Sequence, residues 1–171
     1  FLSIGLLGTW KNLDNLIDWF VKEYKEDADT GLILKVSRSS GSVIDKEKTR
    51  DSLNRILSKH PDRKCKVYLL HGDLSEEELH SLYMREDIHV YATTTHGEGY
   101  GLPIFEAAYN GMPIIATNWS GHLDFLSAPY KESGKIKNKD LFAKVDFELK
   151  EIQPKAIWDK ILIKESKWAY P

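Results

Sequence analysis

The feature that most constrains the fold of this chain is the alternation of short apolar runs with amphipathic segments. The runs predicted to be strands are Phe1–Gly5, Gly31–Ser37, Lys66–Leu70, Ile88–Thr93 and Pro113–Thr117. Such runs are typical of parallel strands, which crossover helices cover on both faces. Five units in series predict an α/β fold, a Rossmann-like open parallel sheet with helices on both faces and right-handed crossovers.

Amphipathic segments between these runs predict the helices. Asp45 is the expected cap of the second helix, and Ser75 and Glu78 have the capping-box spacing that opens a third. A fourth helix should begin near Pro103 and end by Gly111. The first helix has the most continuous apolar stripe, made of Leu13, Leu16, Ile17, Phe20, Val21 and Tyr24.

The regular alternation weakens after Thr117. Lys131–Asp140 is polar and charged and lacks the pattern of the preceding units. Leu141–Leu149 predicts one more strand. Ile157, Trp158, Ile161 and Leu162 predict a last helix, because their spacing places them on one helical face.

Length and composition bound the class of protein. The 171 residues predict a single domain, since domains average roughly 150 residues. A net charge of -2 argues against a nucleic-acid partner, which normally requires a basic face. The single Cys65 excludes an intramolecular disulfide and a cysteine-only metal site. We find no apolar run near the ~18 residues that span a bilayer and no signal peptide, so the expected location is cytoplasmic.

Both ends of the chain look cut. It begins at Phe1 without an initiator Met, directly in an apolar run, and stops abruptly at Pro171. We therefore expect these residues to be one part of a longer protein. Peripheral attachment of that full-length protein to a membrane is a further option.

The loops after the first and fourth strands are the expected location of the chemistry. In open sheets with the Rossmann strand order, ligands bind where the order reverses, and these two loops flank that crevice. The fourth strand is followed by three closely spaced glycines, Gly97, Gly99 and Gly101, and then by a helix start. Close backbone approach and free amides at a helix N-terminus suit a phosphate or a polar sugar.

Two glutamates belong to this segment. Glu106 falls on or beside the inward stripe of the fourth helix, where a carboxylate needs donors such as hydroxyl groups. Its alternative role is a favourable interaction with the helix dipole. Glu98 lies in the glycine loop, seven intervening residues earlier, where a solvated charge would be ordinary.

Taken together, the two glutamates resemble a known signature. Glu98-x(7)-Glu106 is similar to the E-x(7)-E motif of retaining glycosyltransferases of family four. The likeness continues through Asn110–Thr117 and Ser120–Phe125, reaches back to His71–Leu79, and covers well over half of the chain. It implies the nucleotide-sugar-binding half of a GT-B enzyme that moves a hexose from a nucleoside diphosphate sugar to an acceptor. It also implies retention at the anomeric carbon, no cofactor and no required metal ion.

The resemblance implies roles for individual residues. Glu98 would lie beside the donor sugar as the catalytic-site glutamate, and Glu106 would bind the ribose. The backbone amides that would approach the sugar and phosphates belong to Gly99, Tyr100, Gly101 and Leu102.

In this family an Arg and a Lys after the first strand neutralise the diphosphate. Lys11 fits the Lys position, whereas Leu6 stands where the Arg is expected. A possible substitute is Arg38, at the end of the second strand, because the leaving diphosphate gains charge in the transition state. His71, after the third strand, lies near the expected place of the nucleotide base. The six histidines lack metal-ligand spacing, so no metal site is predicted.

The resemblance finally implies a partner. The acceptor-binding N-terminal GT-B domain is absent from the chain, so the isolated domain is expected to bind donor but to be inactive or weakly active. The acceptor can be a glycan, a lipid or a protein. The alternative hypothesis is a catalytically silent Rossmann-like nucleotide-binding module, which Leu6 in place of Arg favours.

Overall fold

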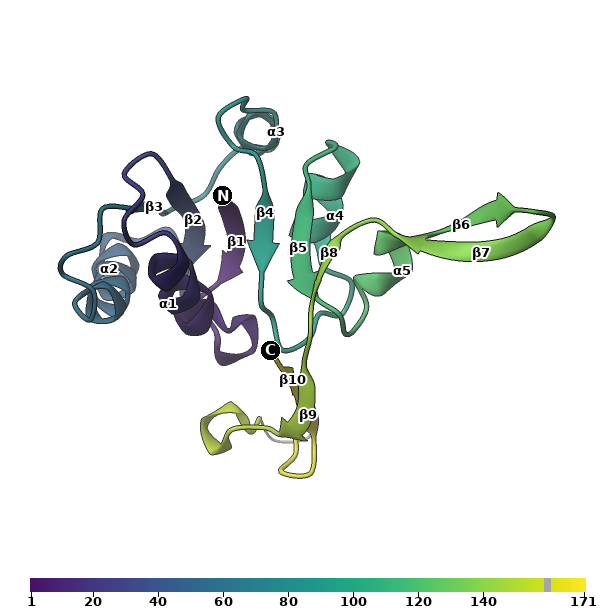
Figure 1. The fold of residues 1–171 in the computed structure, drawn as a ribbon. Coiled ribbons are helices and arrows are strands. Elements are labelled where there is room, and N and C mark those ends of the chain that lie inside the picture. Colours follow the sequence, from purple (N-terminus) through teal and green to yellow (C-terminus); the bar gives the residue numbers. More distant parts are fainter. Residues whose placement is uncertain (159–160) are drawn as a thin grey trace.

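The computed structural model describes residues 1–158 and 161–171, and its centre is an open six-stranded sheet (Figure 1). The spatial order is β3-β2-β1-β4-β5-β8, and neighbouring strands are parallel. All five predicted strands are confirmed, and the order reverses between β1 and β4 as expected for a Rossmann-like sheet. The strands are β1 Leu2–Leu6, β2 Gly31–Ser37, β3 Lys66–Leu70, β4 Tyr91–Thr93, β5 Ile114–Thr117 and β8 Ala143–Val145.

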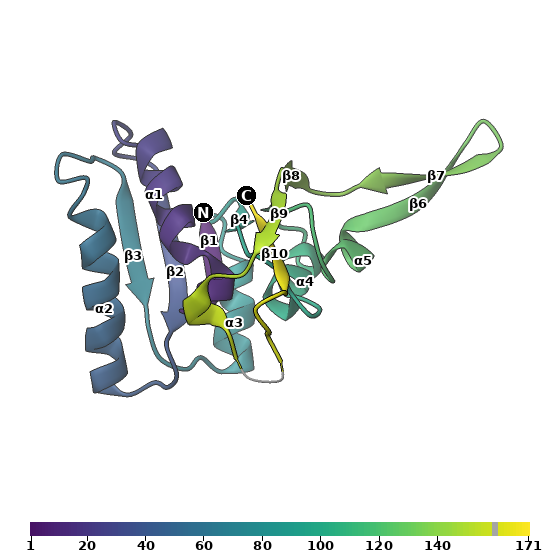
Figure 2. The same ribbon diagram turned by 90° about the horizontal axis from the view of Figure 1, so that it is seen from below.

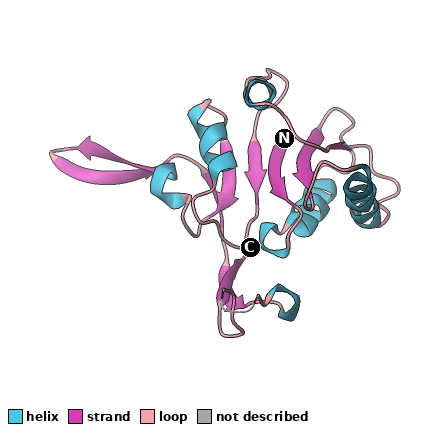
Figure 3. Ribbon diagram, turned by 180° about the vertical axis from the view of Figure 1, so that it is seen from behind, coloured by secondary structure: helices cyan, strands magenta, loops and turns pink. Residues whose placement is uncertain are grey.

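Helices pack on both faces of this sheet. One apolar core joins the sheet to α1 (Leu13–Glu23) and α2 (Val43–Leu57). A second core joins it to α3 (Glu76–Tyr83) and α4 (Leu102–Tyr109), which Figure 3 shows from behind. The predicted stripe of α1 is buried from Leu13 to Val21 because it faces the first of these cores. Two packed layers over one parallel sheet confirm the predicted α/β class.

The helix ends show one wrong prediction. Asp45 is not the cap of α2, because Ser42 takes that position and its Oγ accepts the Asp45 N–H at 3.2 Å. Asp45 is a buried residue of the first turn instead. The Ser75–Glu78 capping box is confirmed at α3, with both of its hydrogen bonds present. Pro103 lies in the first turn of α4, also as predicted.

A long hairpin follows β5 and the short α5 (Leu123–Leu126). Strands β6 (Ser127–Glu132) and β7 (Lys135–Asp140) pair antiparallel and project away from the sheet (Figures 1 and 2). The sequence did not predict it, because nearly all of its residues are exposed and it lacks the apolar alternation that marks a half-buried strand.

The segment after the hairpin corrects two further predictions. Leu141–Leu149 is not one strand, because β8 joins the main sheet and the following residues do not. Strand β9 (Glu148–Glu151) pairs instead with β10 (Lys167–Tyr170), below the carboxyl edge of the main sheet in Figure 1. The predicted last helix is wrong for the described residues of this segment. They form the 3-10 turn η2 (Pro154–Ala156) and a β-bridge between Trp158 and Leu162. The centre of that predicted helix, 159–160, lies outside the described residues. No described helix is long and apolar enough to cross a membrane.

Candidate functional site at the switch point of the sheet

The loops after β1 and β4 are bonded to each other, as the strand order predicted. The loop after β1 contains the 3-10 turn η1 (Thr9–Lys11) and then Asn12, whose φ of 52° turns the chain into α1. Asn12 Nδ2 donates to the Thr94 carbonyl at 3.0 Å, and the His96 amide donates to the Trp10 carbonyl at 2.7 Å. These bonds fix the two loops side by side at the point where ligands bind in such sheets.

Lys11 and Glu98 form an ion pair across this junction. Lys11 Nζ lies 2.6 Å from Glu98 Oε1, and the two side chains are only 14% and 10% exposed. Gly5 makes room for the lysine, because a Cβ there would come within 3.1 Å of Lys11 Cε. Two residues singled out from the sequence, 87 positions apart, are therefore in direct contact.

The loop after β5 holds Glu98 by its backbone. Ser120 Oγ accepts the Glu98 N–H at 3.0 Å and donates to the Glu98 carbonyl at 2.7 Å. The Gly121 amide donates to the same carbonyl at 3.1 Å. Ser120 pays a conformational cost for this position, with φ at +90°. The family likeness included Ser120 and Gly121, but the sequence did not predict that they hold the Glu98 backbone.

The start of α4 presents backbone amides. Gly101 precedes the helix with φ at +90°, and its carbonyl accepts the amides of Ile104 and Phe105. Within the described part of the chain, the amides of Gly99–Leu102 have no protein acceptor. Such amides, together with the positive end of the helix dipole, suit an anionic or polar group. The side chains of Tyr100 and Leu102 are 45% and 61% exposed.

Glu106, on α4, accepts a hydrogen bond from a residue of α3. The Tyr83 hydroxyl at the end of α3 donates to Glu106 Oε2 at 2.9 Å. Burial and this bond to a carboxylate raise the pKa of Tyr83, which keeps the phenol protonated as a donor. The sequence predicted that an inward-facing Glu106 needs a donor such as a hydroxyl group, and the Tyr83 hydroxyl is such a donor. The sequence analysis did not predict Tyr83 as this donor.

Both glutamates also lie near the buried Tyr91. Its hydroxyl donates to the Ile4 carbonyl at 3.2 Å, which joins β4 to β1. Burial raises the pKa of Tyr91, and the negative charges of Glu98 and Glu106 raise it further. The two carboxylates of the predicted motif therefore act electrostatically on one buried group.

His71, which follows β3, contacts Asp45 in the first turn of α2. Its Nε2 lies 2.8 Å from Asp45 Oδ2, and its side chain is 2% exposed. Burial opposes ionisation of Asp45, but hydrogen bonds from His71 and from the amides of Arg38 and Ser40 outweigh it and lower the pKa of Asp45. This network joins the ends of β2 and β3 to α2.

The structure does not bring Arg38 together with Lys11. The Arg38 guanidinium extends toward α2, where Nη1 donates to Ser52 Oγ at 3.3 Å. It lines a separate cavity, to which Lys11 and Glu98 do not contribute. Leu6, at the position expected to hold an arginine, is 46% exposed at the end of β1.

The strand β10 covers the glycine loop at His96, a contact that the sequence analysis missed. His96 stacks on Trp168 with ring centroids 5.1 Å apart, and its Nδ1 donates to the Ala169 carbonyl at 2.6 Å. Tyr170 packs against the same ring. The alternation of aromatic residues near the C-terminus was the available signal, because it is typical of a strand with one buried face. Burial lowers the pKa of His96, so the ring is neutral at pH 7.

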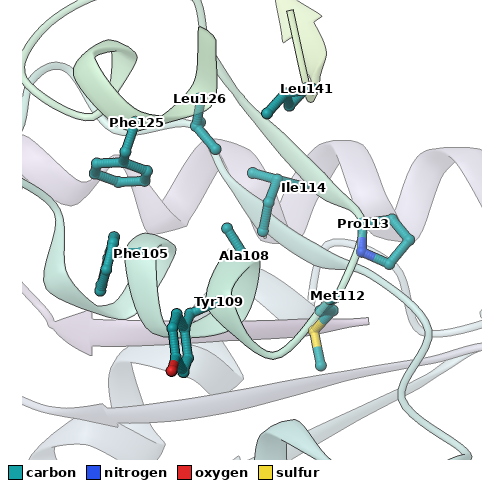
Figure 4. A pocket seen from close by; sticks show the side chains of 10 residues that line it. Phe105, Ala108, Tyr109, Met112, Pro113, Ile114, Phe125, Leu126 and Leu141 are labelled. Atoms are coloured by element: carbon teal, nitrogen blue, oxygen red, sulfur yellow. The ribbon is translucent and has the colours of Figure 1, made fainter. Parts of the chain in front are cut away.

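Another cavity, of about 530 Å³, lies between α4, β5 and α5 (Figure 4). Its wall is apolar and includes Phe105, Met112, Ile114, Phe125 and Leu126. None of the residues predicted for the site lines it. Within residues 1–158 and 161–171, no three His, Cys, Asp or Glu side chains gather as metal ligands would.

Comparison with known sequences identifies similar proteins. The family model described as "Glycosyl transferases group 1" matches residues 1–144. The serotype-specific mannosyltransferase WbdA of Escherichia coli is 30% identical over 115 residues, which is 67% of this chain and 13% of that protein. Another WbdA sequence of Escherichia coli is 40% identical over 65 residues, 38% of this chain and 8% of its own length. The chain thus spans a small part of the curated relatives that it matches.

Solved structures share the fold. The C-terminal domain of a group 1 family glycosyl transferase (LpcC) from Francisella tularensis superimposes with a TM-score of 0.59 and 16% identity, over 85% of this chain and 66% of that one. The structure described as "Trehalose-6-phosphate from E. coli bound with UDP-2-fluoro glucose" gives a TM-score of 0.53 and 15% identity, over 73% of this chain and 30% of that one.

Proposed function

The chain belongs to the group 1 glycosyl transferases, and we propose that it is the donor-binding half of a retaining enzyme that moves a hexose from a nucleoside diphosphate sugar to an acceptor. Its sheet has the Rossmann-like architecture of one half of a GT-B glycosyltransferase. The observation that carries the proposal is the contact between Lys11 and Glu98 beside the amides that open α4.

The chemistry of the leaving group explains this arrangement. When the glycosidic bond breaks, negative charge develops on the nucleoside diphosphate and must be stabilised. Lys11 is the cation at the junction, and the Gly99–Leu102 amides add dipoles aimed outward from the start of α4. In this proposal, these groups balance the diphosphate without a metal ion.

The two glutamates divide the remaining contacts. Glu98 lies beside the donor sugar, with its position fixed by Ser120 and Lys11. Glu106 accepts hydrogen bonds from the ribose while Tyr83 holds one of its oxygens. A carboxylate has two oxygens and about four acceptor sites, so both interactions can coexist.

Different arguments bear on the identity of the donor sugar and on the place where the acceptor binds. The name of the WbdA relatives makes mannose the first hexose to test. The acceptor, a glycan, a lipid or a protein, would be held by a second GT-B half across the cleft. We propose that this second half is needed for turnover.

Calorimetric titration tests donor binding by the chain itself. UDP, GDP, ADP and GDP-mannose are titrated into the wild type and into Glu106→Gln and Lys11→Gln. Each substitution should weaken nucleotide binding about tenfold or more, because each removes a charged hydrogen-bonding partner. Glu23→Gln is the matched control, since Glu23 is exposed in the last turn of α1, at the opposite end of that helix from the site.

The same titration separates the alternative function. A silent nucleotide-binding module, which Leu6 at the arginine position favours, would bind a nucleotide but gain nothing from the attached sugar. Tighter binding of a nucleoside diphosphate sugar than of its diphosphate, lost in Glu98→Gln, supports the transferase. Absence of binding by every nucleotide and donor would remove the basis of the proposed function.

A further inference from the structure

A cavity of about 540 Å³ lies between the loop after β1, the start of α1, the last turns of α2 and the segment after β9. In Figure 1 that segment, with η2, lies below α1. Among the described residues that line the cavity, four carry positive charge: Arg38, Arg55, Lys59 and Lys155. Asp14 is the one described carboxylate in the lining. The cavity therefore concentrates positive charge in a chain whose net charge is -2.

These four cations are not used by the ion pairs of the described chain. Arg38 is oriented by a hydrogen bond to Ser52 Oγ, which also lines the cavity. Like charges that share one concave surface repel one another and raise the local potential. An anion that enters the cavity relieves this repulsion.

The N-terminus of α1 adds to the same field. Leu13, Asp14 and Asn15 form its first turn and line the cavity. The Asn12 side chain does not cap the helix, because its Nδ2 donates to Thr94 and its Oδ1 accepts from Asn15. Within the described residues, the first-turn amides have no protein acceptor. An 11-residue helix thus presents its positive end to the cavity.

This cavity shares the loop after β1 with the proposed donor site but not the residues that make up that site. Lys11, Glu98, Glu106 and the glycine loop do not line it. Its volume lies in the range of small-molecule sites. The planar guanidinium groups of arginines form bidentate hydrogen bonds with phosphate oxygens. We infer that the cavity is a second binding site, which takes a phosphorylated ligand through Arg38, Arg55, Lys59 and the N-terminus of α1.

Calorimetry with inorganic pyrophosphate tests this site. The background is Lys11→Gln, which leaves Glu98 unpaired and so disfavours an anion at the donor site. In that background the chain should bind pyrophosphate, and Arg55→Gln with Lys59→Gln should weaken binding by about tenfold or more. The matched control is Lys46→Gln with Arg50→Gln, one Lys and one Arg that are exposed on α2 outside the cavity. All four positions are exposed, so folding is expected to survive and circular dichroism checks it.

A second arm identifies the source of the phosphate. Flotation with phosphatidylcholine vesicles, with and without phosphatidic acid, detects binding to a lipid headgroup. Arg55- and Lys59-dependent flotation only with phosphatidic acid supports the site and assigns a lipid source, whereas pyrophosphate binding alone assigns a soluble ligand. The inference is overturned if the Lys11→Gln chain binds neither probe, or if the control pair loses as much affinity as the cavity pair.

Discussion

Tyr83 illustrates how one residue fixes the proposed site. Its hydroxyl donates to Glu106 at 2.9 Å, and the side chain is buried between α3 and α4. The carboxylate is therefore oriented before any ligand binds. Preorganisation of this kind reduces the conformational entropy that the protein side chain loses when a ligand binds.

Replacing Tyr83 by Phe should lower both stability and nucleotide affinity. Loss of a hydrogen bond to a carboxylate should cost about 1.5–3 kcal/mol of the free energy of unfolding, measured by urea denaturation. Nucleotide binding should weaken because Glu106 loses its fixed orientation. Tyr109→Phe is the control, since the Tyr109 side chain is 82% exposed. Equal effects of the two substitutions would contradict this account of Tyr83.

Two buried histidines should make the chain sensitive to mild acid. Burial lowers the pKa of His96 and His122 below their ordinary 6.5, against the weaker opposing effect of their bonds to Ala169 and Thr117. Below pH 6.5 the unfolded chain therefore binds more protons than the folded chain, and stability falls as the pH drops. The melting temperature should decrease between about pH 7.5 and about pH 5.5.

In this pH range the stability change arises from histidines and not from Asp45. The stability that Asp45 contributes is complete above its unfolded pKa of 3.8 and is lost only as the pH falls below it through the lowered folded pKa. His80→Gln should leave the pH dependence unchanged because His80 is exposed. A melting temperature that stays constant over the range would show that the buried histidines are not the cause.

At the scale of elements, the loop after β5 is packed directly on the glycine loop. A Cβ on Gly121 would lie 1.9 Å from the Gly99 carbonyl oxygen. Gly121→Ala should therefore displace the loop, cost about 1–3 kcal/mol and weaken donor binding. Denaturation and calorimetry measure the two effects. Gly97→Ala is the control, because its added Cβ would meet Ser120 Oγ at an ordinary 3.5 Å.

The β6–β7 hairpin is an element that the sheet does not need. Its strands are almost wholly exposed, and the Leu141 amide donates to the Leu126 carbonyl at 2.8 Å where the hairpin joins the domain. Replacing residues 128–139 by a short Gly-rich turn should change the free energy of unfolding by only about 0.5 kcal/mol. A large loss in a thermal melt would show that the hairpin supports the fold.

At the scale of the whole molecule, donor binding and turnover should separate. In the proposed function the glutamates lie in one wall of a cleft, and the acceptor is held by the other. The 171-residue chain should bind a nucleoside diphosphate sugar and transfer no hexose above background to added acceptors, as a radiolabelled donor assay would detect. Addition of an acceptor-binding half should restore transfer. Efficient transfer by the chain alone would contradict this division.

Much of the architecture was predictable because its signals are local. The apolar runs, the stripe of α1 and the Ser75–Glu78 box depend on the period of a strand or helix and on residues a few positions apart. Asp45 was misplaced because Ser42 and Asp45 can both cap a helix, and only the backbone of this turn selects Ser42. The strand predicted over residues 141–149 failed because one extended run divides between two sheets.

The sequence by itself determined the α/β class, the two loops at the switch point and the glutamate spacing. Tertiary structure alone decided that Lys11 pairs with Glu98, that Tyr83 holds Glu106, and that Arg38 turns to a different cavity. The physical reason is range. Backbone periodicity and capping act between near neighbours, whereas the partner of a charged side chain depends on which distant elements the packed sheet brings within hydrogen-bonding distance.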